Sequence, residues 1–329
     1  MRELLLSSAH KLVERHTRSA GVVDNDALWD DLVEAGFARA QIDDEPVALA
    51  DAMALVAVLA QHGARTPLGD VWLADWLLSR HGEERQMCVL AGDSDVSLGG
   101  AAPAWRLSGD VWGVALAPSV AHVLLARTLP DGRAGLVVVD AKVGRRVERF
   151  NIAGEVRVDV RFDDAPAQVL PTRIEGHDIR AMASLVRVAQ MLGAMTRALD
   201  LALEHAATRV QFGKPLAKLQ AVQQMQALMA GQIALTSAAL DRATADEADD
   251  GSNAGMAKVV ASGAAGRVAA LAHQILGAMG VSQEHELQRH TRALWAWRDE
   301  LGAEDEWAQR IGRRVLQAGG GELWPTLAP

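Results

Sequence analysis

The chain has 329 residues, which exceeds one typical domain and allows two or three subdomains around a substantial core. Hydrophobic residues make up 50% and charged residues 23%, a balance that excludes a disordered chain. The formal net charge of -9 argues against a protein that binds nucleic acid, because such a protein presents a basic face.

The first part of the chain, residues 1–85, is predicted to be a helical domain. Apolar residues recur at helical spacing near its start, and the segment 48–61 is rich in Ala, Leu and Val. Asp24 or Asn25 is expected to cap a helix, because either side chain accepts a hydrogen bond from the following turn. The capped helix would carry Leu28, Trp29 and Leu32.

The spacing of the apolar residues changes in residues 86–171, which are predicted to form a β-rich middle domain. Short apolar runs are separated by turn signals such as Pro130-Asp131-Gly132. The segment 156–162 alternates between apolar and polar residues, so we expect a strand with one buried and one wet face. The other expected strands lie at 111–116, 122–126 and 135–140.

Residues 172–329 are predicted to be a second helical domain. An acidic segment, 245–252, separates two of its long apolar segments. The order of helices, strands and helices predicts an α+β fold that is mostly α. The long segments, rich in Ala, Leu and Met, lie at 179–205, 216–244, 255–279 and 305–316.

The sequence shows no evident targeting segment, membrane span or metal-binding motif. Its start, Met1-Arg2-Glu3, is charged too soon for a signal peptide, and no segment has the roughly 20 uninterrupted apolar residues that span a bilayer. We therefore expect a cytoplasmic protein without a membrane partner. Cys88 is the only cysteine, which excludes an intrachain disulfide and a multi-cysteine metal site. His285 and His290, at i,i+5 spacing, favour a polar helix over a metal site.

The most informative segment is 209–216, Arg-Val-Gln-Phe-Gly-Lys-Pro-Leu. Arg209 can fork onto phosphate oxygens, and Gly213 allows a tight backbone turn. Phe212 offers an aromatic face, and Pro215 suits the first turn of a following helix. These residue types predict a helix that ends, turns sharply beside an anion and starts again. The alternative is a helix C-terminus in which Arg209 binds only the last backbone carbonyls.

Together with a second block, this segment resembles the acyl-CoA dehydrogenase family, whose members carry R-x-x-F-G-K/R-P between two long helices. Ala257-Lys258, followed by Ala-His-Gln-Ile-Leu-Gly-Ala-Met-Gly at 272–280, is similar to the A-K and Q-x-x-G-G-x-G segments of the family. The spacing between the blocks is also that of the family, and the similarity runs from about Ser184 to Val315. The resemblance implies a three-part fold whose last part is a four-helix bundle.

The resemblance also implies an FAD site shared between subunits. Family members use these two blocks to hold the pyrophosphate and adenine end of an FAD whose flavin lies in a neighbouring subunit. Ala278 stands here in place of the second glycine, and its methyl group narrows the approach to the cofactor. The residues that the resemblance assigns to FAD are Arg209, Gln211, Phe212, Gln274 and Gly277.

The middle domain departs from the family pattern. The family places T-E-P-x-x-G-S-D against the flavin, whereas this chain has Leu-Ala-Gly-Asp-Ser-Asp-Val at 90–96, with Trp105 and Trp112 nearby. The flavin end of the chain's own site is therefore expected to be missing or remodelled.

The catalytic base is also not evident. Desaturation of an acyl thioester needs a carboxylate that removes the α-proton as hydride leaves the β-carbon for flavin N5. The resemblance places this base at Leu301 or at about Ala183, and neither is acidic. Glu300 adjoins the first position and is the candidate base, with Asp299 and Glu175 as further acids; the alternative is a solvated loop charge.

Three functions fit these observations. In the first, the chain is a subunit of a heteromeric acyl-CoA dehydrogenase, as in steroid-degrading family members with fewer FAD sites than subunits. It would then donate half of an FAD site to a partner chain. In the second, it is a self-sufficient homo-oligomeric dehydrogenase with a shifted base. In the third, it is a flavin-free scaffold or binding protein. An active enzyme would bind an acyl-CoA and pass electrons to an electron-transfer flavoprotein.

Overall fold

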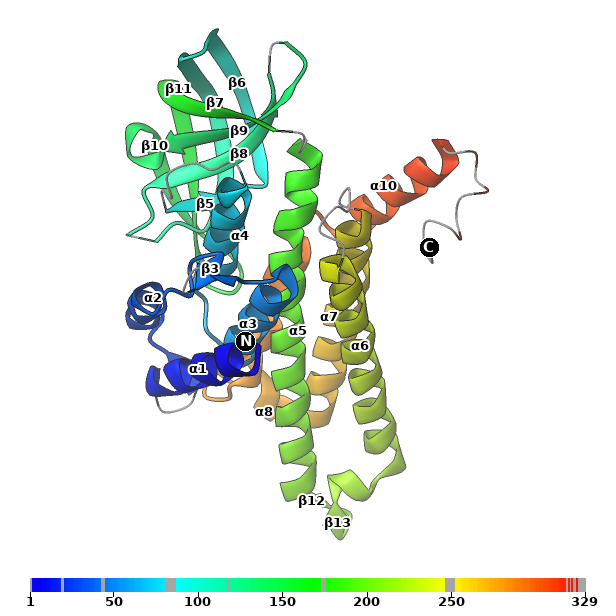
Figure 1. Ribbon diagram of the computed structural model, residues 1–329. Helices are drawn as coiled ribbons and strands as arrows, with labels where there is room; N and C mark the ends of the chain where they lie inside the picture. The colour runs from blue at the N-terminus through cyan, green and yellow to red at the C-terminus, as the bar shows by residue number, and fades with distance from the viewer. Residues whose placement is uncertain are drawn as a thin grey trace.

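The computed structural model places helices at both ends of the chain and a β-sheet between them, which confirms the predicted fold class (Figure 1). The exact domain limits at residues 85 and 171 stay a prediction. The structure describes residues 2–18, 21–42, 45–80, 87–117, 119–129, 131–172, 176–245 and 252–317, and the single residues 319, 321 and 324. Glu175 and most of the acidic segment 245–252 lie outside these ranges.

The N-terminal helices are α1 (Arg2–Arg15), α2 (Asn25–Glu34), α3 (Leu49–Gln61) and α4 (Leu68–Ser79). The predicted cap of α2 is confirmed, because the side chain of Asp24 accepts a hydrogen bond from the backbone N–H of Ala27. Two short antiparallel strand pairs lie between these helices: β1 (Thr17–Arg18) with β2 (Val22–Val23), and β3 (Gln41–Ile42) with β4 (Glu45–Pro46).

The central sheet has the strand order β5-β8-β9-β11-β7-β6, and β10 pairs with β11 beyond this path. The predicted alternation in 156–162 is confirmed, since Val158, Val160 and Phe162 are buried in an apolar cluster that also contains residues of the N-terminal helices. A short 3₁₀ helix, η2 (Ala141–Val143), follows β9. The strands are β5 (Cys88–Leu90), β6 (Asp93–Ala101), β7 (Ala104–Val114), β8 (His122–Thr128), β9 (Ala134–Asp140), β10 (Arg145–Phe150) and β11 (Val156–Thr172).

The C-terminal helices pack mainly as a bundle of α5, α6, α7 and α9, from which α10 projects (Figure 1). The predicted helix at 255–279 is wrong at its end, because Gly277 has a φ of +60° and breaks it into α7 and α8. The bounds are α5 (Gly176–Thr208), α6 (Gln220–Ala245), α7 (Ser252–Leu276), α8 (Ala278–Val281), α9 (Leu287–Asp299) and α10 (Glu304–Gln317). Between α5 and α6 lie β12 (Val210–Gln211), β13 (Lys214–Pro215) and the 3₁₀ helix η3 (Leu216–Lys218).

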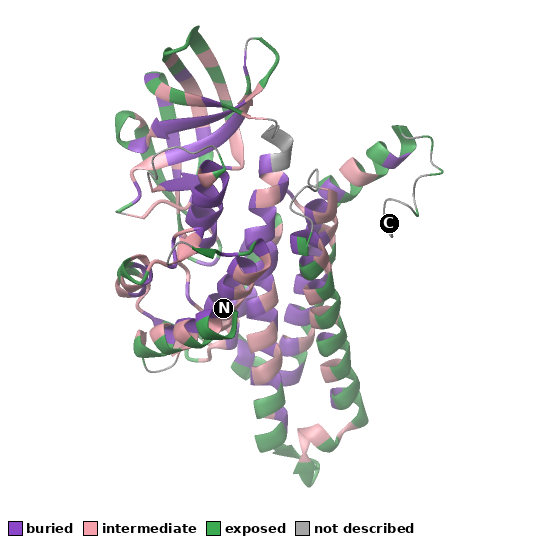
Figure 2. Ribbon diagram, viewed as in Figure 1, coloured by how far each residue is buried: buried purple, intermediate pink, exposed green. Residues whose placement is uncertain are grey.

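The long helix α5 connects the sheet to the far end of the bundle, and its buried side faces the other helices (Figure 2). It crosses α3 very closely at Gly193, where a Cβ atom would lie 2.0 Å from the carbonyl oxygen of Ala57. Within the described residues, α7 is the one helix long and apolar enough to cross a membrane, and half of its most apolar stretch is buried in the protein. Its packing against α5, α6, α9 and α10 is that of a core helix.

Candidate functional site

The R-x-x-F-G-K-P segment forms the predicted sharp turn at the end of α5. The backbone N–H of Arg209 bonds the carbonyl of His205 at 2.9 Å, and the chain then folds back as the β12–β13 hairpin. Phe212 and Gly213 at its tip have φ angles of +54° and +74°. The side chain of Phe212 is 85% exposed, so an apolar ring projects from this end of the molecule.

The Gln274/Gly277 block lies toward the same end of the bundle (Figure 1). Burial lowers the pKa of His205 on α5, and the nearby charges of His285 and Arg209 lower it further, so the segment after α8 lies close to the Arg209 turn. Gln274 and Gly277 are exposed, as are Gln211 and Phe212. We call Arg209, Gln211, Phe212, Gln274 and Gly277 the Arg209 end.

Glu300, the candidate base, lies at the other end of the bundle in a network of ion pairs. Its carboxylate accepts hydrogen bonds from Arg187 Nε at 2.6 Å, from Arg157 Nε and Nη2 at 3.2 and 3.1 Å, and from Asn151 Nδ2 at 2.9 Å. Burial alone would raise the pKa of Glu300, but the charges of Arg187 and Arg157 lower it to about 2. A carboxylate with such a low pKa is a poor proton acceptor, so this environment disfavours the base role.

The network continues through two further buried acids. Arg187, which is 3% exposed, donates from Nη1 to Asp70 on α4 at 3.1 Å. Burial opposes its charge, but Asp70 and Glu300 outweigh this effect and raise the pKa of Arg187 above its ordinary value. Glu155 binds Arg157 Nη2 at 2.7 Å and accepts from the indole N–H of Trp297 at 3.1 Å. Asp70, Glu155, Arg157, Arg187 and Glu300 are hereafter the ion-pair network.

Lys258, the lysine of the A-K motif, fixes the loop that carries Glu300. Its side chain is fully buried, and Nζ donates to the backbone carbonyls of Trp297, Arg298, Glu300 and Gly302 at 2.8–3.0 Å. Two of these carbonyls belong to the last turn of α9, whose C=O groups have no partner within the helix. Lys258 therefore caps α9 from a neighbouring helix, although burial and the nearby charge of Arg187 lower the pKa of its amine to about 7.

The two positions expected for the base meet at one point in the structure. Leu301, whose φ is +58°, places Cδ2 2.5 Å from the position that a Cβ atom on Gly92 would take. The Cβ atom of Ala183 lies 3.5 Å from the same position. Sequence similarity alone thus identified neighbouring positions from α5 and the α9–α10 loop, and both carry apolar side chains. Leu301 and Gly92 border a cavity of about 310 Å³ that also includes Trp112 and Arg180.

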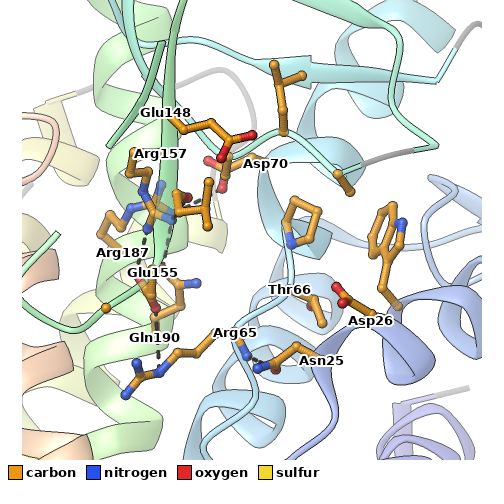
Figure 3. Close-up of a pocket in the computed structure, with 17 residues that line it drawn as sticks. Asn25, Asp26, Arg65, Thr66, Asp70, Glu148, Glu155, Arg157, Arg187 and Gln190 are labelled. Atoms are coloured by element: carbon orange, nitrogen blue, oxygen red, sulfur yellow. Dashed lines mark hydrogen bonds and ion pairs between the residues drawn. The ribbon is translucent and has the colours of Figure 1, made fainter. Parts of the chain in front are cut away.

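A second cavity, of about 420 Å³, lies between α2, the start of α4, the β10–β11 hairpin and α5. Figure 3 shows Arg157, Arg187 and Gln190 on one side and Asn25, Asp26 and Thr66 on the other. We call it the polar cavity. Neither it nor the buried roles of Arg187 and Lys258 were predicted from the sequence. For Arg187 and Lys258, the available signal in the sequence was a charged residue inside an apolar helical segment.

Metal ligation has no support in the described part of the chain, where no three His, Cys, Asp or Glu side chains are grouped to hold an ion.

Comparisons with known proteins agree with the motifs. Residues 181–321 match the model of the acyl-CoA dehydrogenase C-terminal domain. The chain is 32% identical to cyclohex-1-ene-1-carbonyl-CoA dehydrogenase of Geobacter metallireducens, over 53% of this chain and 51% of that protein. It is 25% identical to acyl-CoA dehydrogenase IpdE2 of Mycolicibacterium smegmatis, over 96% of this chain and 99% of that one. The match with the first of these relatives therefore spans only about half of its length.

The fold as a whole is similar to a chain of the ChsE4-ChsE5 complex from Mycobacterium tuberculosis. The TM-score is 0.84 with 20% sequence identity, and the match covers 96% of this chain and 97% of that chain. Identity at this level indicates a shared fold.

Proposed function

We propose that this chain, which belongs to the acyl-CoA dehydrogenase family, takes part in the FAD-dependent α,β-desaturation of an acyl-CoA thioester as one subunit of a heteromeric enzyme. In this role the Arg209 end contributes to an FAD whose flavin, together with the catalytic base, lies on a neighbouring chain. The observation that carries the proposal is the contrast between an exposed Arg209 end and a base position occupied by Leu301 and Ala183.

The Arg209 end suits the phosphate part of such a cofactor. Arg209 and Phe212 are exposed, and the positive φ angles of Phe212 and Gly213 turn the backbone tightly a few residues after Arg209. A planar cation and a close backbone approach are what a pyrophosphate requires. When bound, FAD would supply the hydride acceptor, and the residues of this chain would bind and orient its phosphates.

The chain's own cavity near Trp112 does not suit a flavin. Leu301 occupies the place next to Gly92, and Arg180 spans the cavity with ion pairs to Asp93 and Glu306. A proton acceptor is absent at both expected base positions, and Glu300 is held by two arginines. These residues therefore favour a partner that supplies both the flavin site and the base.

The outer side of α6 supports association through the bundle. Its sequence has no charged residue from Gln220 to Leu240, and Leu228 and Leu235 are 58% and 57% exposed (Figure 2). Such a continuous uncharged helix face is typical of a surface that a second chain covers. We propose a second, unlike acyl-CoA dehydrogenase chain as the occupant, and an electron-transfer flavoprotein as the acceptor of its electrons.

The test compares the purified chain with the same chain co-expressed with an acyl-CoA dehydrogenase-like partner that carries T-E-P-x-x-G-S-D and an intact Glu-Gly. We expect the chain alone to be colourless, and the complex to absorb at about 450 nm, the flavin band, and to oxidise acyl-CoA. One FAD per chain with turnover by the chain alone would contradict the proposal. A colourless complex would support the flavin-free scaffold instead.

Arg209→Met in the complex is expected to weaken FAD binding by about 10- to 100-fold, because a charge-assisted hydrogen bond to phosphate contributes about 1.5–3 kcal/mol. The measurement is fluorescence titration of the flavin-depleted complex with FAD. Arg313→Met, which removes an exposed arginine from α10, is the matched control and should leave the affinity unchanged. Equal affinity in both variants would remove Arg209 from the cofactor site.

A further inference from the structure

The polar cavity is separate from the Arg209 end. Arg187 lies on α5 and Arg209 directly after its end, and their separation of 22 positions corresponds to about 33 Å along a helix. A volume of about 420 Å³ falls in the range of small-molecule pockets, roughly 300–1,000 Å³. The cavity can therefore be tested independently of the proposed shared FAD site.

One wall of the polar cavity presents hydrogen-bond donors without partners. Gln190 is 7% exposed, and its Oε1 accepts a hydrogen bond from Arg187 Nη1 at 3.0 Å, which orients its amide NH₂ group the other way. Neither Gln190 Nε2 nor Arg187 Nη2 has a hydrogen-bond partner among the described residues. Neither atom is sealed from solvent. Both donors therefore face the cavity, where a ligand or water can accept their hydrogen bonds.

The charges of the cavity exclude an anion as the preferred ligand. Four carboxylates, Asp26, Asp70, Glu148 and Glu155, line it against only three guanidinium groups, those of Arg65, Arg157 and Arg187. Most arginine N–H groups are already engaged: Arg65 donates to the carbonyls of Ala153 and Arg289, and the other two arginines bind the acids of the ion-pair network, while Arg187 Nη2 remains without a partner among the described residues. A further negative charge would meet an excess of carboxylates.

The opposite wall is partly apolar. Trp29, Pro67 and Leu116 line the cavity together with Asn25 and Thr66. The indole N–H of Trp29 is turned away to Ser119 Oγ at 2.7 Å. A suitable ligand thus combines an apolar body with an acceptor oxygen.

We propose that the polar cavity binds a neutral, carbonyl-bearing small molecule, whose oxygen accepts hydrogen bonds from Gln190 Nε2 and Arg187 Nη2 while its apolar body packs against Trp29 and Leu116. The ligand is held by the chain itself, whether or not a partner supplies a flavin.

The test uses three probes of the same ring and size: cyclohexyl methyl ketone, cyclohexanecarboxylate and cyclohexylmethylammonium. Each is titrated into the purified full chain, and binding is followed by isothermal titration calorimetry and ligand-observed NMR. We expect the ketone to bind at least about tenfold more tightly than either ion, a difference of about 1.4 kcal/mol. An equal or stronger response to the carboxylate or the ammonium, or no binding of the ketone, would overturn the proposal.

The Gln190→Glu variant tests whether the amide of Gln190 contacts the ligand. The new carboxylate keeps an acceptor for Arg187 Nη1 but removes the NH₂ donor, so the affinity for the ketone should fall by about tenfold. Gln224→Glu makes the same change on the exposed side of α6 and should leave the affinity unchanged. Retention of full ketone affinity in a folded Gln190→Glu protein would also refute the assignment.

Discussion

Replacing Lys258 by methionine is expected to lower the free energy of unfolding by at least about 3 kcal/mol, because several buried carbonyls then lose their donor. Methionine fills a similar volume but cannot donate to the carbonyls of Trp297, Arg298, Glu300 and Gly302. The measurement is urea denaturation followed by tryptophan fluorescence, since Trp297 and Trp307 lie beside the loop.

Lys218→Met serves as the matched control for this effect. Lys218 is exposed at the end of η3, so its replacement should change the free energy of unfolding by less than about 0.5 kcal/mol. If Lys258→Met were as stable as Lys218→Met, the four carbonyls would have to be satisfied by other donors, and the cap of α9 would not depend on Lys258.

Replacing Arg187 by methionine should cost about 3–5 kcal/mol of stability at neutral pH, because Asp70 remains behind as a buried carboxylate without its cation and Glu300 keeps only Arg157 as an ion-pair partner among the described residues. Thermal and urea unfolding of the variant measure this loss. Arg145→Met, which removes an exposed arginine from β10, is the control and should be nearly neutral. A loss below about 1 kcal/mol for Arg187→Met would mean that the ion-pair network contributes little to stability.

The difference in stability between the wild type and Arg187→Met should depend on pH because of the pKa of Glu300. Its pKa is about 2 in the folded protein and near 4.5 ordinarily, so its contribution to wild-type stability is complete above pH 4.5. That contribution is lost as the pH falls from 4.5 toward 2, where the folded carboxylate also takes up a proton. Arg187→Met lacks the main cause of the lowered pKa, so the stability gap between the two proteins should narrow below pH 4.5.

Local patterns in the sequence were sufficient to predict most of the fold. The alternation at 156–162 identified a strand with one buried face, and Asp24 identified the start of α2, because both signals act between neighbouring residues. The end of α7 was missed because Gly277 sits in an apolar run that continues with helical spacing. Its positive φ, which stops the helix, leaves no trace in that spacing.

The site could be predicted only where it follows a motif. The turn after α5 was expected from Arg209 and Gly213, which are close in sequence, and its shape is confirmed. The assignment of the Arg209 end to FAD stays a prediction. Glu300 was identified as an acid beside the expected base position. Its partners Arg157 and Arg187 lie 143 and 113 residues away, so no local pattern indicated an ion pair.

The polar cavity and the Lys258 cap could not be predicted for the same reason. The cavity brings together residues from α2, α4, the β10–β11 hairpin and α5, and each lining residue read alone fits an ordinary surface or helix position. Lys258 was recognised as part of a motif, yet its four acceptors follow it by 39 to 44 residues. Contacts of this kind depend on how whole elements pack, which the spacing of side chains along one element does not encode.

The length of α5 also fixes the angle about the helix axis between residues at its two ends. In an uninterrupted helix each residue adds about 100° of rotation and 1.5 Å of rise, so the direction of Arg209 relative to Arg187 depends on the number of residues between them. A single residue inserted after Ala198 would turn one end about 100° away from the other. Gly193 holds the helix against the Ala57 carbonyl, so rotation of the whole of α5 could not absorb the change. The number of residues in this part of α5 therefore sets the relative orientation of its two ends. Related chains should tolerate substitutions along this stretch far better than insertions or deletions.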